Sequence, residues 1–228
     1  MVSRDVTLAG LEGPADVFQQ HGTSAVSDAM DMLGCTDTGL PGLLRMSGAD
    51  AVVGPAYTLQ YVPVAHGEEA PAGDFIDAVP AGSVVVIAND GRTHCTVWGD
   101  ILAEAALQRG VAGTIIDGAC RDVGALRSLG YSLWSRAAYM KTGKHRVRLD
   151  ALQKPITVCG VRVAPGDIVV ADDAGALIVP AALAEATAEA VLKVHAAEEA
   201  IRAQLAAGVP LKEARRRNGY NALGMTRQ

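Results

Sequence analysis

Short β-branched runs and helix-forming segments, separated by glycines, alternate through the middle of the chain. Residues Thr114 to Ile116 form an apolar run that predicts a buried strand. The segment 101–109 before it contains strong helix formers, and the shorter helical segment 123–129 follows it. Both segments end at a glycine, as helices commonly do. We therefore predict one buried strand between two helices in this part of the chain.

The N-terminal part of the chain predicts two short helices. Residues 14–21 form the first, and Thr23 with Ser24 is suited to capping a second over 25–33. Asp28 and Asp31 are three residues apart and share a face of this second helix. They are weak candidates for metal ligands, because a solvated face or a contact between subunits is the more common explanation for such a pair.

Strands are predicted in the region that follows. Residues 51–62 have the pattern of a strand in two pieces, because Gly54 and Pro55 interrupt the apolar run. The run at 83–88 predicts another strand. Residues 89–98 are more polar, and we expect a loop there that leads into the helix at 101–109.

The second half of the chain is rich in strands that end at glycine or proline turns. A long helix is predicted from Pro180 to about residue 207. The strand content argues against a simple Rossmann fold. No Gly-x-Gly-x-x-Gly follows a strand, so we expect no nucleotide cofactor. Antiparallel hairpins are predicted from the alternating segments 156–159, 161–163, 167–171 and 176–179.

Composition predicts one domain in a reducing compartment. The 228 residues are 50% hydrophobic, enough for one substantial core, so we expect a single domain over 1–228 with a C-terminal helical extension from about residue 181. The net charge of −5 disfavours a nucleic-acid partner. The widely spaced cysteines, and the lack of a signal-peptide core or of a run of about 20 apolar residues, predict a cytoplasmic protein with no membrane partner.

The candidate catalytic and ligand-binding residues lie at the two predicted helix starts. Asp100 begins the first helix after Gly99, where an anion could approach the free amides of the first turn. Arg121 and Asp122 directly precede the second helix, with Asp122 at the N-cap position. If both starts face one cleft, it contains two carboxylates for a hard divalent cation and one guanidinium for a keto acid. Taken singly, each feature is more typical of a helix cap or a surface ion pair.

Other polar groups are weaker candidates. His66 with Glu68 and Glu69 falls in a predicted loop, where solvation is the default expectation. His94 precedes the first helix start, but a cation held by carboxylates prefers oxygen ligands, which favours a structural or gating role for this histidine. The basic run 141–148 is expected to be a solvated loop.

The combination of these residues is more specific than its parts. The pattern Gly-Asp-x(12)-Gly-x(3)-Asp-Gly-x(2)-Arg-Asp, from Gly99 to Asp122, resembles the signature of the RraA-like family, and the resemblance extends over about residues 20–210. This family includes 4-hydroxy-4-methyl-2-oxoglutarate/4-carboxy-4-hydroxy-2-oxoadipate aldolases and the regulator of ribonuclease activity A. The resemblance implies an α/β protein with a three-layered β/β/α swivelling-domain fold. It also implies a ring-shaped homotrimer, sometimes paired into a hexamer, with clefts at the subunit interfaces.

Resemblance to the aldolases implies a role for each matching residue. Asp122 would bind Mg²⁺ or Mn²⁺ directly, and Asp100 would hold a metal-bound water that acts as the base. Arg121 would bind the pyruvyl portion of a 2-oxo acid substrate and neutralise the developing enolate. The substrate-binding set is Gly99, Asp100, Ile101, Leu102 and Arg121, with the amides of the two apolar residues as donors.

The resemblance also implies that a glutamate from the C-terminal region of an adjacent subunit completes the outer metal shell through water. Glu199 is our first choice for this residue. Glu198 is the alternative, because the sequence alone does not fix the register of the helix.

The lysines favour a metal-dependent reaction. Aldol cleavage must stabilise an enolate, either through a lysine imine or through a metal ion. No lysine falls in a predicted buried strand, where desolvation would lower its pKa. We therefore expect a class II aldolase that cleaves 4-hydroxy-4-methyl-2-oxoglutarate or a related 4-hydroxy-2-oxo acid to pyruvate. Oxaloacetate gives the same enolate by losing carbon dioxide, so a decarboxylase side activity is also expected. The lysines are Lys141, Lys144, Lys154, Lys193 and Lys212.

The competing interpretation is a non-catalytic regulator of ribonuclease activity on the same scaffold. The resemblance implies that the regulator lacks a carboxylate at the position of Asp100 and has a shorter C-terminus. This chain has Asp100 and a long C-terminal helix with paired glutamates, which favours the enzyme.

Overall fold

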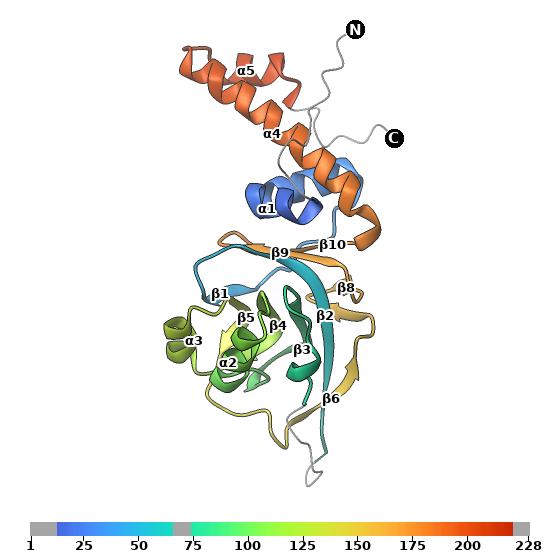
Figure 1. Cartoon of the computed structure of the whole chain (residues 1–228). Coiled ribbons are helices and arrows are strands. Elements are labelled where there is room, and N and C mark those ends of the chain that lie inside the picture. The colour runs from blue at the N-terminus through green and yellow to red at the C-terminus, as the bar shows by residue number, and fades with distance from the viewer. Residues whose placement is uncertain (1–12, 66–73, 221–228) are drawn as a thin grey trace.

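The computed structural model describes residues 13–65 and 74–220. The candidate group at His66, Glu68 and Glu69 lies outside these residues. A body of strands has helices at its side, and a helical arm extends away from the body (Figure 1).

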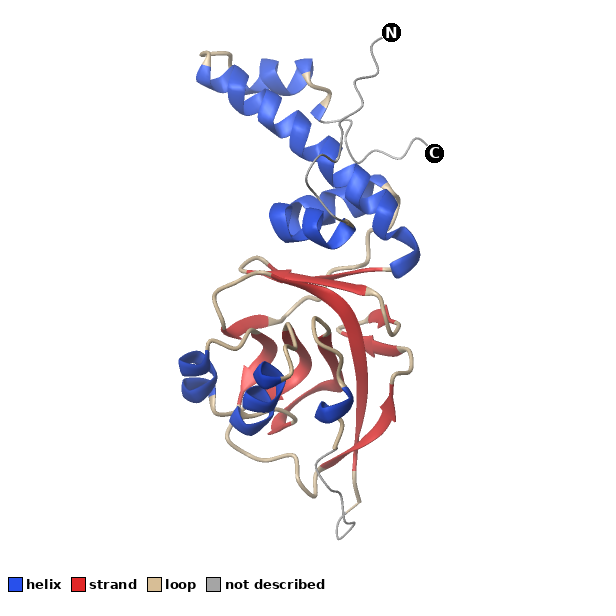
Figure 2. Cartoon of the chain, viewed as in Figure 1, coloured by secondary structure: helices blue, strands red, loops and turns tan. Residues whose placement is uncertain are grey.

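One sheet of eight strands dominates the described body (Figure 2). Its strands follow the order β1-β5-β4-β3-β2-β9-β10, and β6 also pairs with β2. The pairs β2–β3, β3–β4 and β4–β5 are parallel, and the remaining pairs are antiparallel. β7 and β8 form a separate antiparallel pair, so the predicted hairpins are confirmed. The strands are β1 (Leu44–Ser47), β2 (Val52–Pro63), β3 (Val84–Thr96), β4 (Gly113–Cys120), β5 (Leu133–Ala138), β6 (Val147–Leu152), β7 (Ile156–Val158), β8 (Val161–Val163), β9 (Ile168–Asp172) and β10 (Gly175–Val179).

Helices lie on two sides of the strands (Figure 1). α2 and α3 connect β3, β4 and β5, as parallel strands require. α1 and α4 pack against each other and against the β9–β10 hairpin. The helices are α1 (Pro14–Met32), α2 (Asp100–Gln108), α3 (Val123–Leu129), α4 (Ala184–Ala206) and α5 (Leu211–Arg217), with 3-10 turns η1 (Ile76–Ala78) and η2 (Ala181–Leu183).

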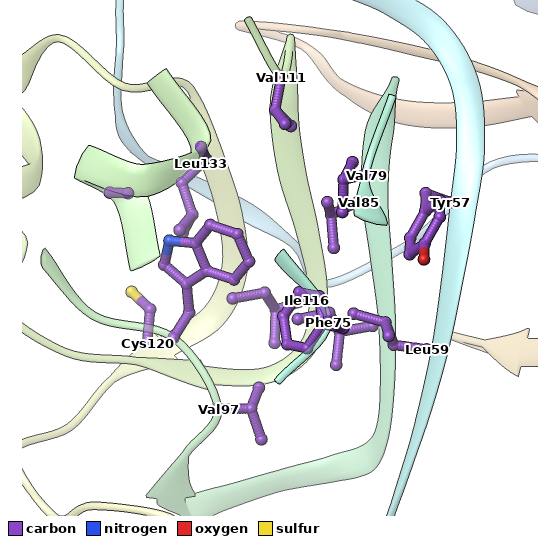
Figure 3. Close-up of a cluster of buried hydrophobic side chains, with 14 of the residues drawn as sticks. Tyr57, Leu59, Phe75, Val79, Val85, Val97, Val111, Ile116, Cys120 and Leu133 are labelled. Carbon is purple, nitrogen blue, oxygen red and sulfur yellow. The ribbon is translucent and has the colours of Figure 1, made fainter. Parts of the chain in front are cut away.

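Three buried clusters separate the layers, and the alternation of side chains along each strand sorts residues among them. In β4, Ile116 belongs to the cluster under α2 and α3, which Figure 3 shows, whereas Ile115 belongs to the cluster between the strands. In β9, Val169 faces this second cluster and Val170 faces the third, where Phe18 of α1 is fully buried. The β/β/α layers implied by the resemblance are confirmed, and α1 and α4 add an outer helical layer.

β2 is one continuous strand, so the prediction of two pieces was wrong. Its residues 52–55 pair with β9, and residues 56–60 pair with β3. Gly54 and Pro55 therefore mark the point where the strand exchanges partners rather than a break. A side chain at Gly54 would overlap the carbonyl of Gly82, so the close approach of this neighbouring segment requires glycine.

β3 and β4 both extend beyond their predicted ends. β3 continues to Thr96 instead of forming a loop from residue 89, and β4 continues past Gly118 to Cys120. Irregular pairing explains the difference, because Arg92 pairs with Gly118 and Thr96 with Ala119 across bulges. These extensions carry the chain to the candidate site.

The two predicted N-terminal helices exist and meet at a kink in α1. Gly22 has φ 73°, and helical residues lie on both sides of it. Thr23 does not cap the second part, because its N–H and its hydroxyl both donate to the carboxylate of Asp172, at 2.8 and 2.7 Å. A Cβ at Gly22 would lie 2.9 Å from the same carboxylate. The kink therefore attaches α1 to the end of β9.

The predicted C-terminal helix is confirmed, with a short 3-10 turn before α4 and Gly208 after it. α5 was not predicted. Within residues 13–65 and 74–220, no helix is long and apolar enough to cross a lipid bilayer.

Candidate active site

Backbone hydrogen bonds bring the two predicted helix starts together. The N–H of Val97 donates to the carbonyl of Ala119 at 3.3 Å, and the N–H of Arg121 donates to the carbonyl of Trp98 at 3.0 Å. These bonds continue the parallel pairing of β3 with β4 beyond the regular strands. The chain then enters α2 from one strand and α3 from the other, so both helices begin at the same edge of the sheet.

The carboxylate of Asp122 lies between the two helix starts. Its Oδ2 atom accepts from Arg121 Nε at 3.0 Å and is 3.5 Å from the backbone nitrogen of Asp100. Asp122 occupies the predicted N-cap position, but its left-handed backbone, with φ 56°, leaves the side chain without a capping hydrogen bond. An aspartate tolerates this conformation better than most residues. Its carboxylate is thereby directed to the start of α2 rather than to its own helix.

Gly99 makes room for this arrangement. A Cβ at Gly99 would lie 2.7 Å from Asp122 Oδ2 and 3.0 Å from Arg121 Nε, which is too close for a real side chain. Its φ of −152° is available to any residue, so the requirement is space and not backbone freedom. The sequence interpretation assigned this space to an incoming anion, but the chain's own side chains occupy it.

Among the described residues, the first turn of α2 retains one donor without a hydrogen-bond partner. The N–H of Ile101 donates to the carboxylate of Asp100 at 2.8 Å, so this amide is already satisfied in the structure. The N–H of Leu102 belongs to the first turn and has no partner within the helix. Of the two amides assigned to substrate, Leu102 is therefore the better placed.

A cleft of about 260 Å³ opens beside these residues. Its floor is apolar, and Trp98, which is only 1% exposed, stacks on Tyr131 with ring centres 5.9 Å apart. The predicted packing role of Trp98 is confirmed. The lining residues are Tyr61, Asp74, Thr96, Val97, Trp98, Gly99, Asp100, Ile101, Leu102, Arg121, Thr142, Gly143, Lys144 and Val147.

Part of the cleft lining comes from the basic run that we expected to be solvated. Thr96 donates through its N–H to the carbonyl of Lys141 at 3.0 Å, and a Cβ at Gly143 would overlap the carbonyl of Thr96. This close packing fixes the turn that carries Lys144 at the edge of the cleft. The five lysines are exposed, as predicted, but sequence reasoning missed that Lys144 faces the same cleft as Arg121.

The two C-terminal glutamates lie elsewhere in the chain. Glu198 and Glu199 are on α4, where both bond to Arg202, at 2.8 and 2.6 Å. Figure 1 shows that α4 lies on the far side of β9 and β10 from α2 and α3. Neither glutamate lines the cleft of its own chain.

The remaining metal candidates do not assemble a site. Asp28 lines a larger hollow of about 890 Å³ beside α1. Its pKa is raised first by burial and then by the nearby carboxylates of Glu198 and Asp31. His94 is exposed on β3 and is not among the residues that line the cleft. Within the described residues, no group of three or more histidine, cysteine, aspartate or glutamate side chains is close enough to hold a metal ion.

The donor set at the helix starts fits a hard cation in part. Asp122 and Asp100 offer carboxylate oxygens, which Mg²⁺ and Mn²⁺ prefer, and Mg²⁺ commonly keeps several waters beside one or two carboxylates. The Asp122 side chain is 35% exposed, so its carboxylate is accessible from solvent. One chain therefore supplies two acidic groups, and water or another chain must supply the other ligands.

Comparisons with known proteins identify the class to which this fold and site belong. The RraA-like family, described as Aldolase/RraA, matches residues 23–178, and the chain belongs to this family. The chain is 31% identical to "Putative 4-hydroxy-4-methyl-2-oxoglutarate aldolase" of Halalkalibacterium halodurans, over 80% of this chain and 84% of that protein. It is 38% identical to Protein DlpA of Legionella pneumophila over 85% of this chain, but it spans only 32% of DlpA.

Among solved structures, the chain resembles RraAS2 of Streptomyces coelicolor, which is described as an unusual member of the RNase ES inhibitor RraA protein family. The TM-score is 0.75 and the identity 27%, over 82% of this chain and 93% of that one. The RraA fold is therefore shared by relatives named as aldolases and by relatives named for ribonuclease inhibition.

Proposed function

We propose that this protein is a divalent-metal-dependent aldolase that cleaves 4-hydroxy-4-methyl-2-oxoglutarate, or a related 4-hydroxy-2-oxo acid, to pyruvate. Decarboxylation of oxaloacetate is the proposed side activity. The observation that carries the proposal is the carboxylate of Asp122, which contacts both Arg121 and the start of α2. Relatives named as 4-hydroxy-4-methyl-2-oxoglutarate aldolases support it at the level of the family.

In this proposal Asp122 holds Mg²⁺ or Mn²⁺ directly, and Asp100 holds a water beside it. When bound, the cation supplies Lewis-acid polarisation of the 2-oxo group. Glu199, or Glu198 in its place, reaches the outer shell from a neighbouring copy, because α4 cannot place it in the cleft of its own chain. The proposal therefore includes a homotrimer or a dimer of trimers.

The chain's own residues then bind and orient the substrate. Arg121 donates to the 2-oxo acid and offsets the negative charge that grows on its keto oxygen as the carbon–carbon bond breaks. The free N–H of Leu102 donates to the substrate carboxylate at the positive end of α2. The water held by Asp100 would take the proton of the 4-hydroxyl group as the carbon–carbon bond breaks, and a proton would then return to the methylene carbon of the enolate to give pyruvate. The apolar floor at Trp98 restricts solvent at the reacting atoms.

Lys144 provides a second cation in the lining of the cleft. A 4-hydroxy-2-oxo acid with a second carboxylate would place one carboxylate near Arg121 and the other near Lys144. A substrate with two or more carboxylates therefore suits the cleft better than a substrate with one.

A substrate panel tests the reaction. Tag-free protein is treated with chelator and supplied with Mg²⁺ or Mn²⁺. Pyruvate release from 4-hydroxy-4-methyl-2-oxoglutarate and from oxaloacetate is then followed through lactate dehydrogenase. We expect release from both that requires the added cation, above a blank with metal and no enzyme. Equal release in the presence of excess chelator would contradict the proposal.

The second candidate is a regulator of a ribonuclease, favoured by the structural similarity to the Streptomyces protein. This candidate would be supported if wild type and Asp122→Ala inhibited RNA cleavage by a purified ribonuclease of the RNase E type to the same extent. Asp100 argues for the enzyme, because a binding surface for a ribonuclease has no need of a carboxylate at this helix start.

A further inference from the structure

We propose that His21 of α1 and His195 of α4 form a binding site for one transition-metal ion of the borderline class, such as Zn²⁺, Ni²⁺ or Cu²⁺. The two imidazole ring centres are 4.4 Å apart, and their planes are inclined by 53°. The residues come from opposite ends of the sequence and meet because the helical arm brings α4 across α1 (Figure 1). This site is separate from the cleft at Asp122.

The helices fix the backbone on both sides of the pair. Phe18 and Met30 of α1 are fully buried in the same cluster as Val191 of α4. Immediately after His21, the kink at Gly22 is held by the bonds from Thr23 to Asp172. The two imidazoles are thus kept within reach of one another before any ion binds, which lowers the entropic cost of chelation.

The separation of the rings suits a shared ion. Metal–nitrogen bonds of about 2.1 Å place the centres of two imidazoles about 4.6 Å apart when they bind at the right angle of a tetragonal Ni²⁺ or Cu²⁺ site. The observed 4.4 Å is close to this value. The outer torsion of a histidine side chain is broad, so each ring can turn a nitrogen to the common point without moving the helices.

The surroundings of the two imidazoles favour binding of a metal ion over a purely structural role. Both side chains are partly exposed, so an ion can reach them. Among the residues that the structure describes, neither imidazole has a hydrogen-bond partner. Imidazole suits Zn²⁺, Ni²⁺ and Cu²⁺, whereas Mg²⁺ prefers oxygen. Glu198 and Glu199, one turn further along α4, are assigned by the proposed function to the cation site of a neighbouring copy, and in this structure both pair with Arg202. The site is therefore a two-histidine site completed by water, and its ion exchanges freely.

Calorimetric titration of tag-free protein with Ni²⁺ tests the site. We expect one Ni²⁺ per chain in Asp122→Ala, in which the proposed cation site of the cleft is removed. His21→Gln and His195→Gln should each weaken this binding at least tenfold. His94→Gln is the matched control, since His94 is exposed on β3 and lies outside the pair, and it should bind Ni²⁺ as the wild type does.

A second readout separates loss of ligands from loss of fold. Cu²⁺ bound to wild type should give an electron paramagnetic resonance spectrum with coupling to two nitrogens, and each glutamine variant should show one at most. Circular dichroism checks that the variants keep their helices. Equal Ni²⁺ binding in both variants, no binding by wild type at millimolar Ni²⁺, or loss of binding in Asp122→Ala would each overturn the proposal.

Discussion

The backbone nitrogen of Asp100 lies 3.5 Å from a carboxylate oxygen of Asp122, 22 residues further along the chain, so the starts of two helices share one acidic group. The same oxygen accepts from Arg121 at 3.0 Å. Each of the predictions about catalysis depends on this shared position, because it sets where a cation and the guanidinium meet the substrate.

Replacing Gly99 by alanine should lower activity without unfolding the protein. The new Cβ would stand 2.7 Å from the Asp122 carboxylate and 3.0 Å from Arg121, and both must move. We expect kcat/KM for pyruvate release to fall at least tenfold. Gly124→Ala is the control, because a Cβ there meets nothing within 4 Å and α3 tolerates alanine. Activity equal to wild type in Gly99→Ala would show that the spacing at the helix starts does not matter.

Arg121→Lys should lower kcat although the charge is kept. A lysine cannot present the planar fork of an arginine to both a 2-oxo acid and the neighbouring carboxylate. We expect kcat to fall about a hundredfold, the scale seen when one oxyanion donor is lost. Arg127→Lys serves as the control, because Arg127 is exposed on α3 outside the cleft. An unchanged kcat in Arg121→Lys would mean that this guanidinium does not act on the reacting oxygen.

Lys144→Met should discriminate between substrates. Loss of a charge-assisted hydrogen bond of about 1.5–3 kcal/mol should reduce kcat/KM about 10- to 100-fold for 4-hydroxy-4-methyl-2-oxoglutarate. For 4-hydroxy-2-oxopentanoate, which has a single carboxylate, the change should be small. Lys154→Met, at an exposed lysine outside the cleft, should affect neither. Equal losses on both substrates would refute a role in binding the distal carboxylate.

The positions of the helix starts could be predicted from the sequence, whereas the shape of the cleft could not. Asp100 and Asp122 could be placed at helix starts from local signals, because the glycines and helix-forming residues that mark these helices lie within a few residues of them. The wall at 142–144 depends on long-range packing against Thr96, which no local pattern encodes. Without that contact, Lys144 has the sequence signature of an ordinary solvated lysine.

The strand pattern was similarly incomplete where pairing changes along a strand. Gly54 and Pro55 are residues that usually interrupt a strand. β2 nevertheless continues through them, because its residues 52–55 pair with β9 and its residues 56–60 pair with β3. Glu198 and Glu199 illustrate a different limit. Their proposed role requires a second chain, so no pattern within one chain encodes it.

The link between Thr23 and Asp172 should make stability depend on pH in the acid range. Although burial opposes ionisation of Asp172, hydrogen bonds from Thr23 and Ala174 and the nearby Arg45 lower its pKa below the ordinary value of 3.8. A carboxyl group with a lowered pKa stabilises the fold above its unfolded pKa and loses this contribution as the pH falls through its folded pKa.

Thr23→Val should therefore destabilise the protein by roughly 1 kcal/mol at neutral pH, because one bond to the carboxylate is lost. The difference from wild type should shrink as the pH falls below about 4. Urea unfolding at several pH values measures it, with Thr93→Val, at an exposed position on β3, as the control. A difference that does not change with pH would rule out a contribution from the ionised Asp172.

Pyruvate release by Asp122→Ala as a function of Mn²⁺ concentration tests the central claim most directly. Asp77→Ala is the matched control, because the Asp77 side chain is 96% exposed and outside the cleft. We predict Mn²⁺-dependent release from 4-hydroxy-4-methyl-2-oxoglutarate in wild type and Asp77→Ala, and no release above the blank in Asp122→Ala at any Mn²⁺ concentration. Release by Asp122→Ala at the wild-type rate and with the same Mn²⁺ dependence would contradict the account.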